Sequence, residues 1–224
     1  MSEVLIKVEK LVKKFGETEI LHGLTIDFHA GDRIALIGQN GAGKTTLIRC
    51  ILGLYTYEGY LEVLGHNPRT DRTEILKNVG FVPQLPPPLR MKVSELMSFF
   101  SEIFGVKKQV YIDLTQRLNL DVEKHMDKPF LKLSGGMKQK LLVSLALGHN
   151  PQILLMDEPA ANLDPAARVI LFDMLKNYRE DALMLISSHR TDEIEHLINR
   201  VVEMDLGHIV IDKKFEPVQK ENNC

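Results

Sequence analysis

Cysteine is scarce in this chain of 224 residues, and no long apolar run occurs in it. The only two cysteines, Cys50 and Cys224, offer neither a disulfide framework nor zinc-ligand spacing, which fits a reducing compartment. Residues 1–7 lack the basic segment and apolar core of a signal peptide. No apolar stretch approaches the roughly 20 residues that cross a bilayer. We therefore expect that any work at a membrane requires another protein to hold the chain there.

Neither charge nor repetition indicates a special class of protein. The formal net charge is −2, and hydrophobic residues make up 44% and charged residues 26% of the chain, as in ordinary globular proteins. The near-neutral charge gives no indication of a nucleic-acid partner. We find no internal repeat and no low-complexity tract. The length allows one large domain or two small ones.

A glycine-rich loop lies between a predicted strand at 33–37 and a predicted helix at 47–52. Its glycines let main-chain N–H groups approach bulky, anionic phosphates, and the helix adds its partially positive N-terminus. In this pattern, G-x-x-x-x-G-K-[ST], the lysine binds the outer phosphates and the threonine binds Mg²⁺. An ordinary turn with a nearby lysine is the alternative. The loop consists of Gly38, Gln39, Asn40, Gly41, Ala42, Gly43, Lys44, Thr45 and Thr46.

The strand and helix patterns predict an α/β protein. Alternating apolar residues at 4–8 and 24–28 indicate an antiparallel sheet with one solvated face. Continuous apolar runs at 153–156 and 183–186 indicate strands covered on both faces. Two further strands, at 201–204 and 208–211, flank an Asp-Leu-Gly turn and are predicted as a hairpin.

Residues 86–149 have a different, helical texture. Ser94 is predicted as the N-cap of a helix at 95–104, and the apolar residues of this region are expected to form a small core of their own. The predicted organisation is a single domain at 1–215, with an α/β core at about 1–85 and 150–215. The segment at about 86–149 would be an inserted helical subdomain, and a polar tail follows at 216–224.

Two further groups of residues are candidates for chemistry. Asp157 and Glu158 follow a predicted buried strand, at the sheet edge where ligands usually bind in α/β proteins. Asp157 would hold Mg²⁺, and Glu158 would reach a water aligned on the γ-phosphate. Ser134 can cap a helix, and Gly135 and Gly136 expose its first N–H groups as a second phosphate cradle. A solvated carboxylate pair and a plain capped helix are the alternatives.

The order of these motifs resembles that of the nucleotide-binding subunit of an ATP-binding cassette (ABC) transporter, of the exporter-type, ABC-2-like kind. Leu-Ser-Gly-Gly-Met-Lys-Gln, which begins at Leu133, matches the signature motif of that family. Its serine precedes Asp157 by 23 positions, a spacing normal for the family. The resemblance covers roughly residues 4–212. It implies a P-loop NTPase (RecA-like) core with an N-terminal antiparallel β-subdomain and an inserted α-helical subdomain.

The resemblance also implies roles for individual residues. Gly38 to Thr46 resembles the Walker A loop, and Ser134 to Gly136 would contact the ATP of a partner subunit. Phe15 is the expected aromatic that stacks on adenine, although an ordinary packing role is the alternative. The implied catalytic residues are Glu158, His189, Lys44 and Gln84, and the implied Mg²⁺ ligands are Thr45, Gln84 and Asp157. His189 would be the switch histidine at the γ-phosphate; alone, it would be an ordinary surface histidine.

The expected function is binding and hydrolysis of ATP, with Mg²⁺, to power transport by a separate membrane permease. The resemblance implies a homodimer, or a heterodimer with a similar cassette, that works in the cytoplasm on the inner face of the membrane. One alternative is an ABC ATPase that acts on ribosomes or DNA, but this chain has one cassette and no heptad stretch. A regulatory subunit that does not hydrolyse ATP is a further alternative, which the retained Glu158 and His189 disfavour.

Overall fold

A computed structural model describes residues 2–188 and 191–215 and divides the chain into two compact units. Unit 1 comprises Met1–Ile75 and Leu183–Cys224, and unit 2 comprises Leu76–Ala182. The predicted subdomain limits at about 86 and 149 differ from these division points and stay predictions. The polar tail at 216–224 and His189 lie outside the described residues.

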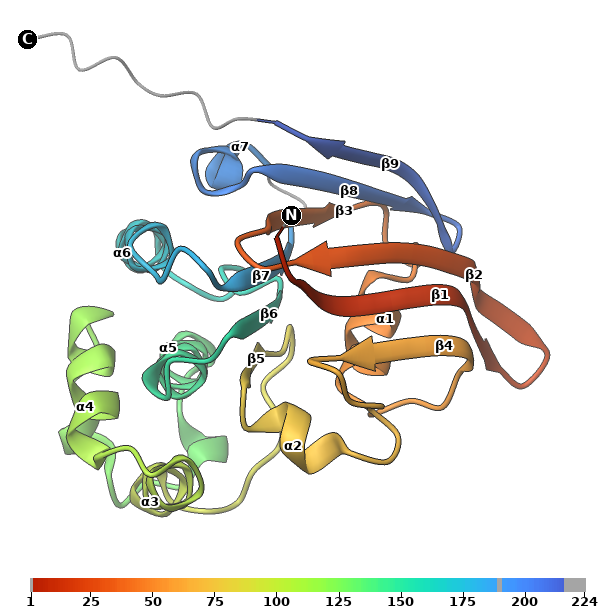
Figure 1. The fold of residues 1–224 in the computed structure, drawn as a ribbon. Helices are drawn as coiled ribbons and strands as arrows, with labels where there is room; N and C mark the ends of the chain where they lie inside the picture. Colours follow the sequence, from red (N-terminus) through yellow and green to blue (C-terminus); the bar gives the residue numbers. More distant parts are fainter. Residues whose placement is uncertain (1, 189–190, 216–224) are drawn as a thin grey trace, which may run out of the picture. The chain divides into compact units, whose positions relative to one another are not determined.

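Strands dominate unit 1, and helices dominate unit 2 (Figure 1). The strands of unit 1 are β1 (Val4–Phe15), β2 (Thr18–His29), β3 (Arg33–Ile37), β4 (Glu58–Val63), β7 (Leu183–Ser187), β8 (Arg200–Asp205) and β9 (His208–Lys214). Its helices are α1 (Lys44–Ile51), α7 (Thr191–Ile194) and the short η3 (Glu195–Leu197), and α2 (Arg72–Leu76) ends at the first residue of unit 2. Unit 2 contains β5 (Val79–Val82), α3 (Val93–Phe104), α4 (Lys108–Arg117), η1 (Val122–His125), η2 (Phe130–Lys132), α5 (Gly135–Gly148), β6 (Ile153–Asp157) and α6 (Pro165–Lys176).

The first sheet of unit 1 is antiparallel, with the strand order β2-β1-β4, which confirms the pairing predicted from alternation. A β-bulge interrupts β1, because its register shifts between Val8 and Leu11 against β2, and Lys10 has a φ of 49°. A bulge adds one residue to the strand and reverses which side chains face inward. Ile6 and Val8 are buried before the bulge, whereas Leu11 and Lys13 are buried after it.

The second group of strands in unit 1 surrounds β3. This strand pairs in parallel with β7 on one side and with β8 on the other, and β8 turns back into β9 as an antiparallel hairpin. The central residues of β3, Ile34 to Leu36, are fully buried. In β7, each residue from Leu183 to Ile186 is at most 2% exposed. The continuous apolar runs therefore form strands covered on both faces, as predicted, and the hairpin is confirmed.

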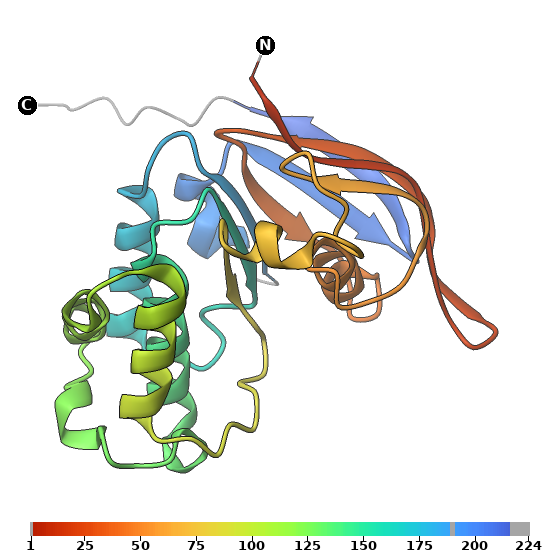
Figure 2. The same cartoon turned by 60° about the horizontal axis from the view of Figure 1, so that its bottom comes forward.

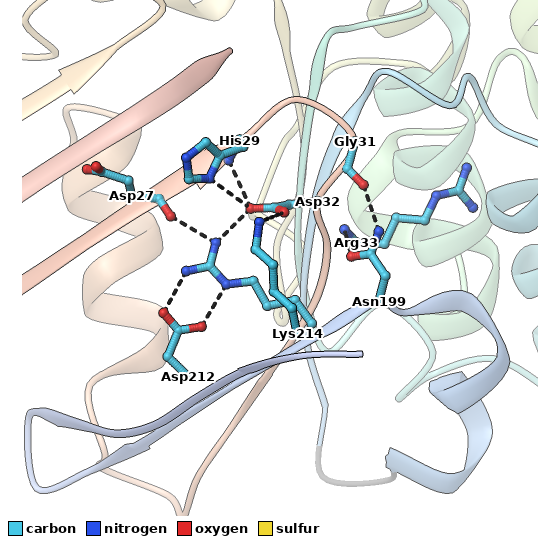
Figure 3. A network of polar contacts seen from close by, with 9 residues as sticks. Asp27, His29, Gly31, Asp32, Arg33, Asn199, Asp212 and Lys214 are labelled. Carbon is cyan, nitrogen blue, oxygen red and sulfur yellow. Dashed lines mark hydrogen bonds and ion pairs between the residues drawn. The ribbon is translucent and has the colours of Figure 1, made fainter. Parts of the chain in front are cut away.

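An ion-pair network joins the turn before β3 to the hairpin (Figure 3). Arg200, which is 4% exposed, donates to Asp32 Oδ2 at 2.6 Å and to both carboxylate oxygens of Asp212 at 2.7 Å. Lys214 Nζ lies 2.9 Å from Asp32 Oδ1, and the main-chain N–H of His29 donates to Asp32 Oδ2 at 2.9 Å. Opposite charges therefore compensate the two buried charges, those of Arg200 and Asp32, and removal of either partner would leave a buried charge without full compensation.

In unit 2, β5 pairs with β6 in parallel, and α3, α4 and α5 lie side by side in both ribbon views (Figures 1 and 2). These helices share a core, which confirms that the apolar residues of the helical region pack on one another. Its buried members are Val93, Leu96, Met97, Tyr111, Ile112, Leu120, Val122, Phe130, Leu133, Leu141, Leu142 and Leu145.

The prediction that Ser94 caps α3 is wrong, because the N-cap is Lys92 and the helix begins at Val93. The Glu95 carboxylate accepts a hydrogen bond from the Lys92 N–H at 2.8 Å. The N–H groups of Val93 and Ser94 donate to carbonyls of Lys128 and Met126, both at 3.0 Å. A distant segment of chain therefore satisfies the free N–H groups that a capping serine would otherwise satisfy.

Among the described residues, none of the helices has the length and apolar character needed to cross a membrane.

Candidate nucleotide-binding site

The glycine-rich loop of unit 1 connects β3 to α1, as the sequence predicts. Gly38, Gly41 and Gly43 have φ values of 142°, 87° and 103°, in a region that residues with a Cβ rarely enter. A Cβ on Gly38 would overlap the carbonyl oxygen of Met204, and one on Gly43 would lie 2.7 Å from Leu21 Cδ2. Glycine is therefore required at position 38 for conformation and for space, and at position 43 for its conformation.

The N-terminus of α1 suits an anion. Its N-cap, Gly43, supplies no side-chain hydrogen bond, and the first turn contains no acidic residue. The helix dipole and the first N–H groups therefore present positive charge that no carboxylate of that turn neutralises. Lys44 is 7% exposed, and its Nζ donates to the carbonyl oxygens of Gly38 at 2.6 Å and Gln39 at 3.0 Å. The ammonium thus lies folded over the loop.

The β8–β9 hairpin contacts this loop, and no pattern in the sequence predicts this contact. The N–H of Gly207 donates to the carbonyl of Ala42 at 3.1 Å, and its carbonyl accepts from the N–H of His22 at the same distance. The carbonyl oxygen of Met204, in β8, also lies close to Gly38 of the loop. The Asp-Leu-Gly turn signal predicted a hairpin but could not indicate which segment it would touch.

Phe15, the expected adenine platform, ends β1 and is 45% exposed. Its ring meets Tyr55 edge-on, with centroids 5.1 Å apart and an interplanar angle of 85°. Lys13 Nζ lies 4.5 Å from the Phe15 centroid. The sequence patterns pointed to neither Lys13 nor Tyr55. For Lys13 the reason is the bulge in β1, which hides its inward position from simple alternation.

In unit 2, the parallel pairing of β5 and β6 brings two predicted Mg²⁺ ligands, Gln84 and Asp157, to the same edge of the strand pair. Val82 faces Met156 across the pair, so Gln84 and Asp157 both leave the carboxyl ends of neighbouring strands. Asp157 is 3% exposed, and Gln84 is exposed. Glu158 has a φ of 51°, which is uncommon for a residue with a side chain and is frequent at functional sites.

Ser134 caps α5, as predicted, and its Oγ accepts from the Met137 N–H at 3.3 Å. Ser134 and Gly135 are exposed, and the first turn of α5 contains no acidic residue. The same helix reaches the segment after Glu158, because Gln139 Nε2 donates to the Pro159 carbonyl at 3.0 Å. Lys140 Nζ also lies 2.9 Å from Asp164 Oδ2. This helix start, Gly136 included, is a second position where N–H groups could meet an anion.

Each unit therefore contains some of the residues predicted to bind or hydrolyse the nucleotide. Phe15 and the loop from Gly38 to Thr46 belong to unit 1, whereas Gln84, Ser134 to Gly136, Asp157 and Glu158 belong to unit 2. His189, the expected switch histidine, lies outside the described residues.

Comparisons with known proteins agree with the motifs. The family model described as "ABC transporter" matches residues 21–161. Phosphate import ATP-binding protein PstB 1 of Streptococcus mutans is 31% identical over 226 residues, which cover 94% of this chain and 90% of that protein. Bacitracin transport ATP-binding protein BcrA of Bacillus licheniformis is 32% identical over 225 residues, covering 97% of this chain and 72% of that protein.

Other relatives are much longer than this chain. Human ATP-binding cassette sub-family A member 10 is 34% identical over 214 residues, which cover 91% of this chain but only 14% of that protein. Among solved structures, an ATP-binding subunit of an ABC transporter superposes with a TM-score of 0.83 at 25% identity, covering 94% of this chain and 90% of that one. With its fold, its phosphate loop and its signature helix, this chain belongs to the ABC transporter family, as an ATP-binding cassette.

Proposed function

We propose that this chain binds ATP with Mg²⁺ and hydrolyses it to power transport by a separate membrane permease. The observation that supports this most directly is the start of α1. There, a glycine loop, an N-terminus without a side-chain cap and the folded-over Lys44 present positive charge to an anion. Polyphosphate is the ligand that this combination of N–H groups and a lysine binds.

The donor set fits Mg²⁺. Thr45 in the first turn of α1, Asp157 at the end of β6 and Gln84 beyond β5 offer hydroxyl, carboxylate and amide oxygens, the hard ligands that this ion prefers. The described residues contain no group of three or more His, Cys, Asp or Glu side chains placed to hold a metal. Mg²⁺ sites in ATPases need only one or two protein ligands, because phosphates and waters supply the others. When bound, the ion would neutralise charge on the outer phosphates.

In this proposal the chain's own residues divide the work. Lys44 and the N–H groups of the loop, from Gly38 to Thr46, bind the phosphates and stabilise the charge that develops on them. Glu158 holds and polarises the attacking water, assisted by Gln84 and His189. Phe15 stacks on adenine through its exposed ring.

Ser134, Gly135 and Gly136 bind the γ-phosphate of an ATP held by a second subunit. The proposed assembly is a head-to-tail homodimer, or a heterodimer with a similar cassette, that closes on ATP and reopens after hydrolysis. It would act at the inner face of the membrane, bound to the permease. The wording of the signature motif supports export, whereas the similarity to the phosphate import protein PstB 1 supports import. Uptake and efflux assays with the co-purified permease decide the direction.

The test of hydrolysis is Glu158→Gln. We expect this variant to bind ATP with Mg²⁺ as tightly as the parent chain and to release phosphate at least about a hundredfold more slowly, because the water loses its base. ATP should then accumulate between subunits, so the variant should elute as a dimer in size-exclusion chromatography with ATP present.

The matched control is Glu180→Gln, which changes an exposed glutamate of the same unit. It should leave turnover and elution unchanged. Near-normal turnover in Glu158→Gln would contradict the role of Glu158. Co-purification of the tagged chain with nucleic acid, and not with a protein that spans the membrane several times, would contradict the proposed transport function.

A further inference from the structure

Lys13 is a buried lysine beside the proposed adenine platform. Only 7% of the residue is exposed. Its Nζ lies 4.5 Å from the ring centroid of Phe15 and 5.4 Å from that of Tyr55, and within hydrogen-bond range of Thr56 Oγ1 at 3.4 Å. Lysine is seldom buried unless its charge is compensated, and two aromatic rings provide such compensation through cation–π attraction.

The bulge in β1 is the reason that Lys13 faces inward. The register shift before Leu11 moves the buried positions to Leu11 and Lys13, while Lys14 is left in solvent. The side chain of Lys14 is 47% exposed and pairs with Glu19 at 3.2 Å. Two adjacent lysines therefore lie in opposite environments, one under the aromatic pair and one at the surface.

The same cluster extends to the phosphate loop. Tyr55 follows α1, and its hydroxyl accepts a hydrogen bond from Arg49 of that helix. The Arg49 guanidinium carbon also lies 5.5 Å from the Tyr55 ring centroid. A chain of contacts therefore runs from the phosphate-loop helix through Tyr55 to Phe15 and Lys13. Movement of the Phe15 ring relative to α1 would break these contacts.

We propose that Lys13 is a positioning residue for the purine base of the bound nucleotide. Its ammonium holds the Phe15 ring in place and leaves the exposed part of that ring for the base. A cation on one ring face also withdraws electron density from it, which favours stacking of an electron-rich purine on the other. This inference rests on the proposed nucleotide-binding function and adds a residue that acts on the base and not on the phosphates.

The test compares two ligands and three variants. Lys13→Met removes the charge and keeps the length of the side chain, Lys13→Arg keeps the charge, and Lys14→Met is the control at the exposed neighbour. Dissociation constants are measured by calorimetry for ATP and for inorganic triphosphate, both with Mg²⁺. We expect Lys13→Met to bind ATP about three- to tenfold more weakly, as the loss of one cation–π contact implies, and to bind triphosphate unchanged. Lys13→Arg should restore most of the ATP affinity, and Lys14→Met should change neither constant.

Unchanged ATP affinity in Lys13→Met would overturn the proposal. An equal loss for both ligands would also overturn it, since that result indicates a general structural role. If Lys13→Met does not fold, Tyr55→Leu replaces it, because removing the aromatic ring that contacts Phe15 and Lys13 should weaken ATP binding and spare triphosphate. A parent chain that binds neither ligand would contradict the proposed function itself, which separates the two failures.

Discussion

At the scale of single residues, Asp32 shows how a buried charge is stabilised in this fold. Burial by itself would raise the pKa of Asp32, but hydrogen bonds from Lys214, from the His29 N–H and from Arg200 outweigh that effect. The pKa therefore lies below its usual value of 3.8. A carboxyl whose pKa is lower in the folded chain than in the unfolded chain stabilises the fold while it is ionised.

Asp32→Asn should therefore destabilise the chain in a pH-dependent way. Near pH 7 we expect a loss of free energy of unfolding on the order of 3 kcal/mol, because the variant leaves buried Arg200 without one of its carboxylates. The difference from the parent chain is fully present above the unfolded pKa and should be lost as the pH falls through the depressed folded pKa. Urea unfolding from pH 7 to pH 3 measures it.

The control for this prediction is Asp127→Asn. The Asp127 side chain is 94% exposed and pairs with Lys92 at 3.1 Å, so its loss should have little effect at any pH. A difference between Asp32→Asn and the parent chain that is independent of pH would show that the charge of Asp32 does not contribute to stability.

At the scale of elements, the β8–β9 hairpin supports the phosphate loop from a distant part of the sequence. Gly207 has a φ of 76°, and a Cβ at this position would overlap the carbonyl oxygen of Ile20. Its N–H also donates to Ala42 in the loop. A substitution in the hairpin turn should therefore affect a site that is far away in the sequence.

Gly207→Ala should lower both stability and ATP affinity. We expect a destabilisation of more than about 2 kcal/mol, made up of left-handed backbone strain and the overlap with Ile20. Displacement of the hairpin from Ala42 should then weaken ATP binding, measured by calorimetry at a temperature where the variant is folded.

The matched control is Gly65→Ala. Gly65 has nearly the same φ, 77°, and a Cβ there would have no heavy atom within 4 Å. This control should show the strain alone, about 1 kcal/mol, with normal ATP affinity. Equal effects of the two substitutions on ATP binding would mean that the hairpin does not support the loop.

At the scale of the whole molecule, the proposed sites require two chains. The phosphate loop would bind ATP in one subunit, and Ser134 at the start of α5 would complete the site from the other. Isologous arrangement of two copies gives two equivalent sites, each built from different parts of both subunits. This organisation makes a prediction for mixtures of variants that a site within a single chain does not make.

Lys44→Ala and Ser134→Arg should each abolish ATP hydrolysis when assayed alone. Mixed in equal amounts they should regain about a quarter of the parent activity, because half of the dimers are mixed and each has one intact site of two. Phosphate release by the mixture measures this.

As the control, a chain with both substitutions is mixed with the parent chain. Mixed dimers then have two damaged sites, so activity should fall below that of the parent chain diluted to the same concentration. If the first mixture gains no activity and the second loses none, each site is complete within one chain.

The sequence by itself determined the local features of this protein. The glycine loop, the buried strands and the cap at Ser134 follow from short-range patterns, because glycine, apolar runs and a capping hydroxyl act within a few residues of their own position. Only the tertiary structure decided that Lys92 and not Ser94 is the N-cap of α3, since carbonyl groups of Lys128 and Met126 accept hydrogen bonds from the first N–H groups of the helix. It also decided that Lys13 lies under Phe15 and that Gly207 braces Ala42. Such contacts depend on a bulge and on pairing between distant strands, and no local pattern encodes either.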